Sequence, residues 1–99
     1  MNPAREILNR MDGELAERIT AAAVKCGTTV YTARSHGPAI RDAARAGEAT
    51  PIGLLQQGFV TSTARFVGRF EAKMIAIAGH QLRPGCPMAG PLYPEDIEL

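Results

Sequence analysis

Tryptophan is absent from this sequence of 99 residues, and only five residues are aromatic. With so few large rings, the core is expected to consist mainly of Ala, Ile, Leu and Val, and a chain of this length buries only a modest one. No apolar run approaches the roughly 18 to 20 residues that cross a bilayer, and the N-terminus lacks a hydrophobic secretion signal. We therefore expect a cytoplasmic protein.

Cysteine and histidine are too few and too widely spaced to predict a metal site. Cys26, His36, His80 and Cys86 supply two thiols and two imidazoles, but no close C-x-x-C or H-x-x-x-H pair occurs, whereas structural zinc sites use such pairs. In a reducing compartment the two cysteines are expected to be free thiols. The P-loop and the G-x-G-x-x-G fingerprint are also missing. We expect no metal, no cofactor and no enzymatic activity.

Net charge is also small, at +1, which argues against a protein that binds long nucleic acid by neutralising many phosphates. The charges are unevenly distributed, because positions 25 to 73 hold seven basic and three acidic residues. The basic residues are Lys25, Arg34, Arg41, Arg45, Arg65, Arg69 and Lys73, and the acidic ones are Asp42, Glu48 and Glu71. This excess of four predicts a site for a small anion, although scattered surface charges give the same count.

The pattern along the chain predicts a single domain, residues 1–99, in three parts. Residues 1–18 are expected to form an N-terminal helix, because Asn2 and Pro3 suit a helix start and apolar residues follow at helical spacing. Residues 19–82 are the core, and residues 83–99 are rich in Pro and Gly, which predicts an extended tail. The tail's Leu92, Tyr93 and Ile97 are expected to dock onto a neighbouring subunit, sharing a core between copies.

Residues 19–32 are ambiguous. Ala21, Ala22 and Ala23 favour a helix that Gly27 would close, whereas the β-prone run 28–32 favours a hairpin that turns at 27–28. We favour the hairpin, in which Ala22, Val24 and Cys26 alternate inward against Val30 and Thr32.

A clear helix opens at Gly37 and Pro38 and closes at Gly47, with a narrow face of small residues. Arg41 and Arg45 are four positions apart and therefore share one side of it. This spacing suits binding of a phosphate, and it is equally typical of a solvated helix face.

The stretch 58–81 is the most informative part of the chain. Residues 58–61 and 65–67 are β-prone runs around the tight connection 62–64, and from Arg69 to Ala78 the spacing becomes helical. Phe70, Met74, Ile77 and Ala78 are expected on one apolar stripe, with Gly79 ending the helix. The fold class predicted is α+β: an N-terminal helix, a small antiparallel sheet built from two hairpins each followed by a helix, and an extended C-terminal tail.

This second hairpin and helix are expected to bring Arg65, Arg69, Lys73 and His80 within reach of one small region. A binding site for a nucleotide needs guanidinium groups for phosphate, an aromatic face for the base, and polar donors for its edges. The phosphate candidates are Arg65, Arg69 and Lys73, with Arg41 and Arg45; the stacking candidates are Phe70 and Tyr31; the donors are His36, His80 and Gln81. For Phe70, packing in the core is the favoured interpretation, because it begins the apolar stripe.

The order of residues resembles a family of small proteins encoded by phages and prophages, with the pattern G-F-x-T-S-x-G-R-F-V-D-R-x-E-A followed by a helix that ends in G-Q. The matching residues are Gly58, Phe59, Thr61, Ser62, Arg65, Phe66, Val67, Arg69, Glu71, Ala72 and Gln81. Weaker similarities are found at Val30-Tyr31, at Ser35-His36 with Ile40, and at the end, where Leu92-Tyr93-Pro94-Glu95-Asp96 corresponds to L-Y-S-E-D. The resemblance covers roughly residues 20 to 98.

The chain departs from the family pattern at three positions. Ala64 stands where the pattern has Gly, and at a positive φ it would cost about 1 kcal/mol. Gly68 replaces an Asp that would cap the following helix, so Glu71 lacks its partner for a capping box. Ser35 replaces the first of two paired histidines, leaving only His36 for a role in binding.

This family is similar to the anti-Thoeris proteins that phages use as sponges for cyclic ADP-ribose-type or cyclic dinucleotide immune signals. The resemblance implies a homo-oligomer in the host bacterial cytoplasm that captures a small anionic nucleotide ligand between subunits, with no chemical step. Two alternatives stay open. One is a phage protein that binds a host protein through its Ala-rich helices and Pro-rich tail, and the other is a small nucleic-acid-binding module.

Overall fold

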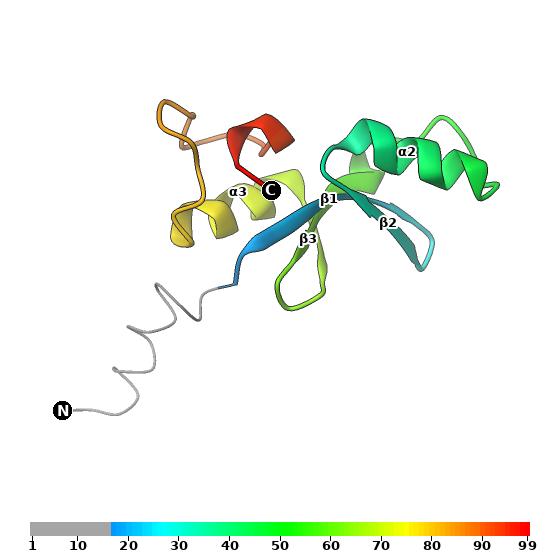
Figure 1. Cartoon of the computed structure of the whole chain (residues 1–99), viewed down its shortest axis with the longest axis horizontal. Coiled ribbons are helices and arrows are strands. Elements are labelled where there is room, and N and C mark those ends of the chain that lie inside the picture. The colour runs from blue at the N-terminus through cyan, green and yellow to red at the C-terminus, as the bar shows by residue number, and fades with distance from the viewer. Residues whose placement is uncertain (1–16) are drawn as a thin grey trace.

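The computed structural model describes residues 17–99, which form two β-hairpins, each followed by a helix (Figure 1). In chain order the elements are β1 (Ile19–Cys26), β2 (Thr29–Ala33), α2 (His36–Arg45), the 3-10 turn η1 (Leu54–Gln56), β3 (Gln57–Thr61), β4 (Phe66–Gly68), α3 (Arg69–Ala78) and the 3-10 turn η2 (Pro94–Asp96). The strands form one antiparallel sheet in the order β2-β1-β3-β4. The α+β class and its two hairpin-helix units are confirmed. The expected N-terminal helix lies outside the described residues, of which the first two precede β1.

The first hairpin resolves the ambiguity of residues 19–32 in favour of strands. Cys26 pairs with Thr29 across the turn, which sets Val24 opposite Tyr31. The expectation that Val30 and Thr32 face inward is wrong, because both are exposed, while Tyr31 packs against the cluster around Val24. Side chains alternate along a strand, so a register that differs by one residue moves every side chain to the other face.

The two helices cover the same face of the sheet (Figure 1). Ala22 and Val24 lie two positions apart on β1, so their side chains point to the same face of the sheet, and each belongs to a buried cluster with a different helix. Val24 packs with Ala39 and Ala43 of α2, whereas Ala22 belongs to the cluster that contains Ala72 and Ala76 of α3. These alanines are fully buried, so the small faces of both helices lie against the sheet. None of the helices within residues 17–99 is long and apolar enough to cross a bilayer.

Helix α3 has the expected bounds but buries a different face. Ala72, Lys73 and Ala76 are its buried residues, while Phe70 and Met74 are 67% and 71% exposed. The expected apolar stripe and the core packing of Phe70 are therefore wrong. The alanines allow the helix backbone to approach the sheet closely, which turns the larger side chains of the neighbouring stripe toward solvent.

The C-terminal tail packs onto its own chain. Leu92 and Ile97 are fully buried in the cluster formed by Phe59, Val67 and α3. The backbone N–H of Leu92 donates to the carbonyl oxygen of Arg69 at 2.9 Å, and Leu82 forms a β-bridge with Ile97. The expectation that Leu92 and Ile97 dock onto a neighbouring subunit is therefore wrong, because both side chains are buried within their own chain, whereas Tyr93 is 43% exposed.

Neither end of α3 carries the residue type most typical of its cap position. Gly68 precedes the helix without a side-chain cap, as expected from the missing Asp. At the other end Gly79 follows the last helical residue, but His80 is the residue with positive φ, at 54°. The N–H of Gln81 donates to the carbonyl oxygen of Ala76 at 2.8 Å, the long bond of a Schellman motif.

The turn of the second hairpin holds Ala64 at φ 62°, a left-handed conformation in which a Cβ is strained. We predict that Ala64→Gly raises the free energy of unfolding by about 0.5 to 1 kcal/mol, measured by urea denaturation. Ala46→Gly is the matched control, because Ala46 follows α2 with a φ of −80° and gains nothing from glycine. Equal loss of stability in both variants would contradict the strain at Ala64.

Candidate functional site

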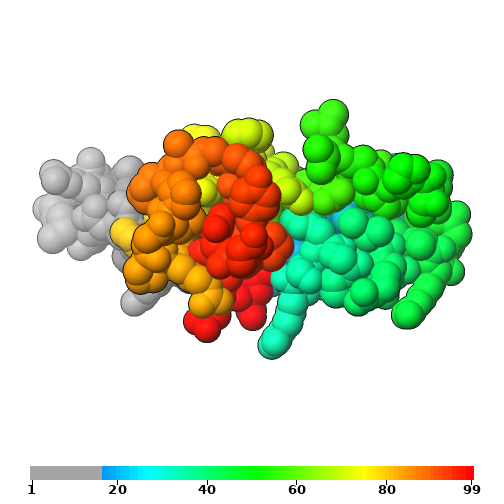
Figure 2. Space-filling view, turned by 90° about the horizontal axis from the view of Figure 1, so that it is seen from above, coloured from blue at the N-terminus to red at the C-terminus, as the bar shows by residue number. Residues whose placement is uncertain are grey.

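A cleft of about 450 Å³ opens between η1, the start of α3 and the tail. Figure 2 shows the green chain around η1 projecting from the surface, with yellow-green chain next to it and the orange part of the tail beyond. The lining residues are Leu54, Leu55, Gln57, Gly68, Arg69, Phe70, Glu71, Pro91 and Tyr93. Most of this lining is apolar, and Arg69 is the one basic residue that the described part of the chain contributes to it. The cleft therefore combines apolar walls with a single guanidinium group.

Arg69 is held in place from three sides. Its Nη2 donates to the side-chain oxygen of Gln57 at 2.8 Å and lies 3.3 Å from Nδ1 of His36. The guanidinium carbon stands 5.3 Å from the centre of the Tyr93 ring, a cation–π distance. Nε is buried without a partner, and no hydrogen bond within residues 17–99 engages Nη1. The group is thus oriented by the protein and retains donor capacity.

His36 connects α2 to this arrangement. Its Nε2 lies 2.7 Å from the carbonyl oxygen of Gly58, and since a carbonyl only accepts, Nε2 carries the proton. A guanidinium only donates, so Nδ1 accepts from Arg69 and the ring is neutral. Burial lowers the pKa of His36, and the positive charge of Arg69 lowers it further, against the opposing effects of the Gly58 carbonyl and Glu95. A neutral His36 therefore supports the position of Arg69.

This lowered pKa predicts that stability depends on pH. The unfolded chain binds a proton at His36 more readily than the folded one, so stability is fully present above about pH 6.5 and falls as the pH drops toward the lower pKa of the folded state. We expect the free energy of unfolding in urea to decrease between pH 7.5 and 5.5, and His36→Gln to weaken that dependence. His80→Gln is the control, because His80 is exposed. A wild-type protein equally stable at both pH values would contradict this assignment.

Arg65 is already occupied by two carboxylates. Its Nε lies 2.7 Å from Oε2 of Glu17 and its Nη1 lies 2.8 Å from Oε2 of Glu71. The hydroxyl groups of Thr61 and Thr63 also donate to Glu17. Hydrogen bonds from Arg65 and the two threonines lower the pKa of Glu17 to about 2. This cluster fixes the tip of the second hairpin and brings the Glu71 carboxylate to the rim of the cleft.

Lys73 and Gln81 have contacts that stabilise the fold. Lys73 is 3% exposed. Its Nζ donates to the carbonyl oxygen of Pro87 at 2.7 Å and lies 3.9 Å from the thiol of Cys86. These contacts connect the tail to α3. Gln81 accepts from the backbone N–H of Ile19 at 2.7 Å and donates to its carbonyl oxygen at 2.9 Å. Both side chains are engaged within the protein.

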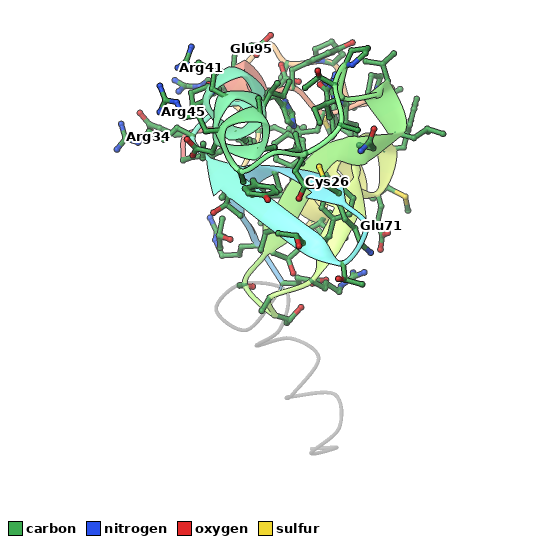
Figure 3. All side chains as sticks on the ribbon, turned by 90° about the vertical axis from the view of Figure 1, so that its right-hand side faces the viewer. Cys26, Arg34, Arg41, Arg45, Glu71 and Glu95 are labelled. Carbon is green, nitrogen blue, oxygen red and sulfur yellow. The ribbon has the colours of Figure 1, made fainter. Side chains whose placement is uncertain are left out.

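The remaining candidates lie away from the cleft. Tyr31 donates to Glu48 at 2.7 Å, a bond that raises the pKa of Tyr31 to about 12. His80 lines a separate hollow at the far end of α3. Figure 3 shows Arg41 and Arg45 projecting with Arg34 on the side of the molecule opposite Glu71. The expected convergence of Arg65, Arg69, Lys73 and His80 on one region is therefore wrong.

Of the ten candidates, Arg69 and Phe70 line the cleft, and His36 accepts a hydrogen bond from Arg69. Sequence reasoning missed Gln57, Tyr93, Leu54 and Leu55 as parts of this site. A signal existed for Tyr93, which lies in the segment that resembles L-Y-S-E-D. Within residues 17–99, no group of three or more His, Cys, Asp and Glu side chains is arranged to hold a metal ion.

The fold and the site together define a small α+β protein in which two hairpin-helix units and a docked tail build an apolar cleft around one arginine. A family model described as Phage T4 y16D protein matches residues 18–97. The chain therefore belongs to the phage T4 y16D protein family, which confirms the phage-encoded family expected from the signature. Neither curated proteins nor solved structures give a significant match.

Proposed function

We propose that this protein binds and sequesters a cyclic nucleotide immune signal without converting it, as a phage anti-defence protein. The observation that carries the proposal is the position of Arg69, a guanidinium group whose Nη1 makes no hydrogen bond within residues 17–99, at an apolar cleft lined by two aromatic side chains. Such a cleft offers charge-assisted hydrogen bonds to phosphate and flat apolar surfaces for a base.

The start of α3 adds to the attraction for an anion. Gly68, Arg69, Phe70 and Glu71 all line the cleft, so the N-terminus of this ten-residue helix faces it, and no side chain caps that end. The amide groups and the dipole at a helix N-terminus favour negative charge. Phe70 is exposed on the first turn and provides a stacking surface next to these donors. Phosphate and base would thus be recognised by one helix end.

Isothermal titration with a panel of cyclic nucleotides tests this proposal. Saturable binding at a fixed stoichiometry, followed by recovery of the intact nucleotide from the denatured complex, would support capture without turnover. Recovery of a cleaved nucleotide would make the protein an enzyme. A panel in which no nucleotide binds would contradict the proposal altogether.

We also propose a homo-oligomer in which a second copy covers the cleft. Leu55 and Leu54 are 97% and 75% exposed on η1, directly beside Phe70 and Tyr93, and contiguous exposed apolar groups mark interaction surfaces. Light scattering that finds only monomers at millimolar concentration would contradict this assembly.

The same exposed leucines favour one alternative function, binding of a host protein. The surface first expected for it, the Ala-rich helices and the Pro-rich tail, is exposed only in part, because Ala39, Ala43, Ala72 and Ala76 are buried against the sheet and the tail buries Leu92 and Ile97 in the core. A host protein would instead contact η1 and the exposed side of α3. Co-purification from host lysate that is lost on Leu55→Glu, combined with no nucleotide binding, would favour this function over capture of a signal.

A further inference from the structure

We infer that the Arg69 cleft selects a nucleotide with a single negative charge, a cyclic mononucleotide, and that Glu71 is the residue that sets this limit. The inference rests on the proposed function and narrows it. The cyclic dinucleotides and cyclic ADP-ribose-type signals implied by the family resemblance each carry two phosphates, whereas a 3′,5′-cyclic mononucleotide carries one phosphodiester.

The first step is the charge available to a ligand. Among the described residues that line the cleft, Arg69 is the one with a cationic side chain. The neighbouring Arg65 is shared between Glu17 and Glu71, so that cluster of one guanidinium and two carboxylates has a net charge of −1. A ligand with one negative charge is therefore matched by Arg69 alone. A second negative charge finds no further cation among the lining residues within 17–99 and faces the Glu71 carboxylate.

The second step is the medium in which these charges act. Leu54, Leu55, Phe70, Pro91 and Tyr93 form apolar walls around Arg69. Apolar side chains beside Arg69 lower the effective dielectric there, which strengthens the attraction of one phosphate to Arg69. The Glu71 side chain is 52% exposed, so its repulsion of a second charge is partly screened by water and adds to that effect. A charge removed from water without a partner is also penalised by its lost hydration. Selection by charge is thus sharper here than at an open surface.

The third step is size. The cleft measures about 450 Å³, in the lower part of the range of about 300 to 1,000 Å³ for small-molecule pockets. This space suits one nucleoside, with its base against Phe70 and its phosphate on the Arg69 guanidinium group, better than it suits two. Size and charge therefore point to the same ligand class.

Calorimetric titrations of the full chain with 3′,5′-cyclic AMP and 5′-AMP, and with the matching guanosine pair, test the charge limit, because each pair shares its base and sugar. A phosphomonoester carries a charge of about −1.5 to −2 at pH 7. We expect the cyclic member of the preferred pair to bind about tenfold more tightly or better, and cyclic di-AMP and cyclic di-GMP to bind more weakly still. Glu71→Gln is expected to reduce the ratio of the affinity for the cyclic nucleotide to that for the 5′-monophosphate. Asp42→Asn on α2 is the matched control, which should leave this ratio of affinities unchanged.

Each result decides a different claim. Equal or tighter binding of the 5′-monophosphate or of a cyclic dinucleotide would overturn the inference and leave the proposed capture of a cyclic signal intact. A preference for the cyclic mononucleotide that Glu71→Gln does not change would remove Glu71 as its cause and overturn that part of the inference. Absence of binding by every nucleotide would overturn the proposed function itself.

Discussion

Leu92→Ala should destabilise the protein more than any other single truncation considered for this chain. Leu92 is fully buried between α3 and the sheet, and its backbone N–H anchors the tail on Arg69. Truncation of a buried leucine removes its transfer free energy and leaves a cavity, which costs about 2 to 5 kcal/mol. For a domain of this size that is a large part of the total stability. Urea denaturation followed by circular dichroism measures the loss.

Leu55→Ala is the control for this prediction, since Leu55 is 97% exposed and its truncation should change stability by no more than about 0.5 kcal/mol. The comparison uses the same chemical change at a buried and an exposed site. Similar stabilities for the two variants would contradict the docking of the tail into the core of its own chain. Because Tyr93 follows Leu92 and stacks on Arg69, a detached tail would also disturb the cleft.

Arg69→Ala should abolish nucleotide binding, with a loss of about 100-fold or more. The physical reason is the loss of charge-assisted hydrogen bonds to phosphate at a largely apolar cleft, an effect of about 3 kcal/mol. The fold should survive, since Arg69 is half-covered and its partners Gln57 and His36 keep other contacts. Titration calorimetry measures the affinity, and light scattering checks that the assembly is unchanged.

Arg41→Ala is the matched control, because Arg41 is an exposed arginine on α2, on the other side of the molecule from Glu71 (Figure 3). It should bind nucleotide as the wild type does. An Arg69→Ala protein with unchanged affinity would remove this residue from the site. A loss of binding in Arg41→Ala instead would move the site to the basic face of α2.

The elements with local signals were predictable from the sequence. Gly37, Pro38 and Gly47 delimit α2 within one or two residues, and the change from β-prone to helical spacing at Arg69 marks the start of α3. The pairing of the strands was harder to predict from the sequence, because the register of β1 and β2 depends on which residues flank a two-residue turn. A shift of one residue there exchanges Val30 for Tyr31 on the inner face.

The candidate site was only partly predictable, because tertiary contacts decide which charges are free. Arg65 and Arg69 look alike in the sequence, but Arg65 lies between two carboxylates and Arg69 faces a cleft. Lys73 looks like a surface cation and is buried under the tail. The apolar spacing of α3 suggested the wrong face, since Ala72 and Ala76 give no strong hydrophobic signal yet permit the closest packing.

The most direct test of the account is a nuclear magnetic resonance titration of the isotope-labelled full chain with 3′,5′-cyclic AMP and 3′,5′-cyclic GMP. We predict that one of them shifts the backbone signals around η1, at the start of α3 and at Tyr93, with the side-chain signals of Arg69 among the largest changes. Signals of α2 around Arg41 and Arg45 should stay in place. Shifts concentrated on α2, or spectra that neither nucleotide changes, would contradict the assignment of the Arg69 cleft as the binding site.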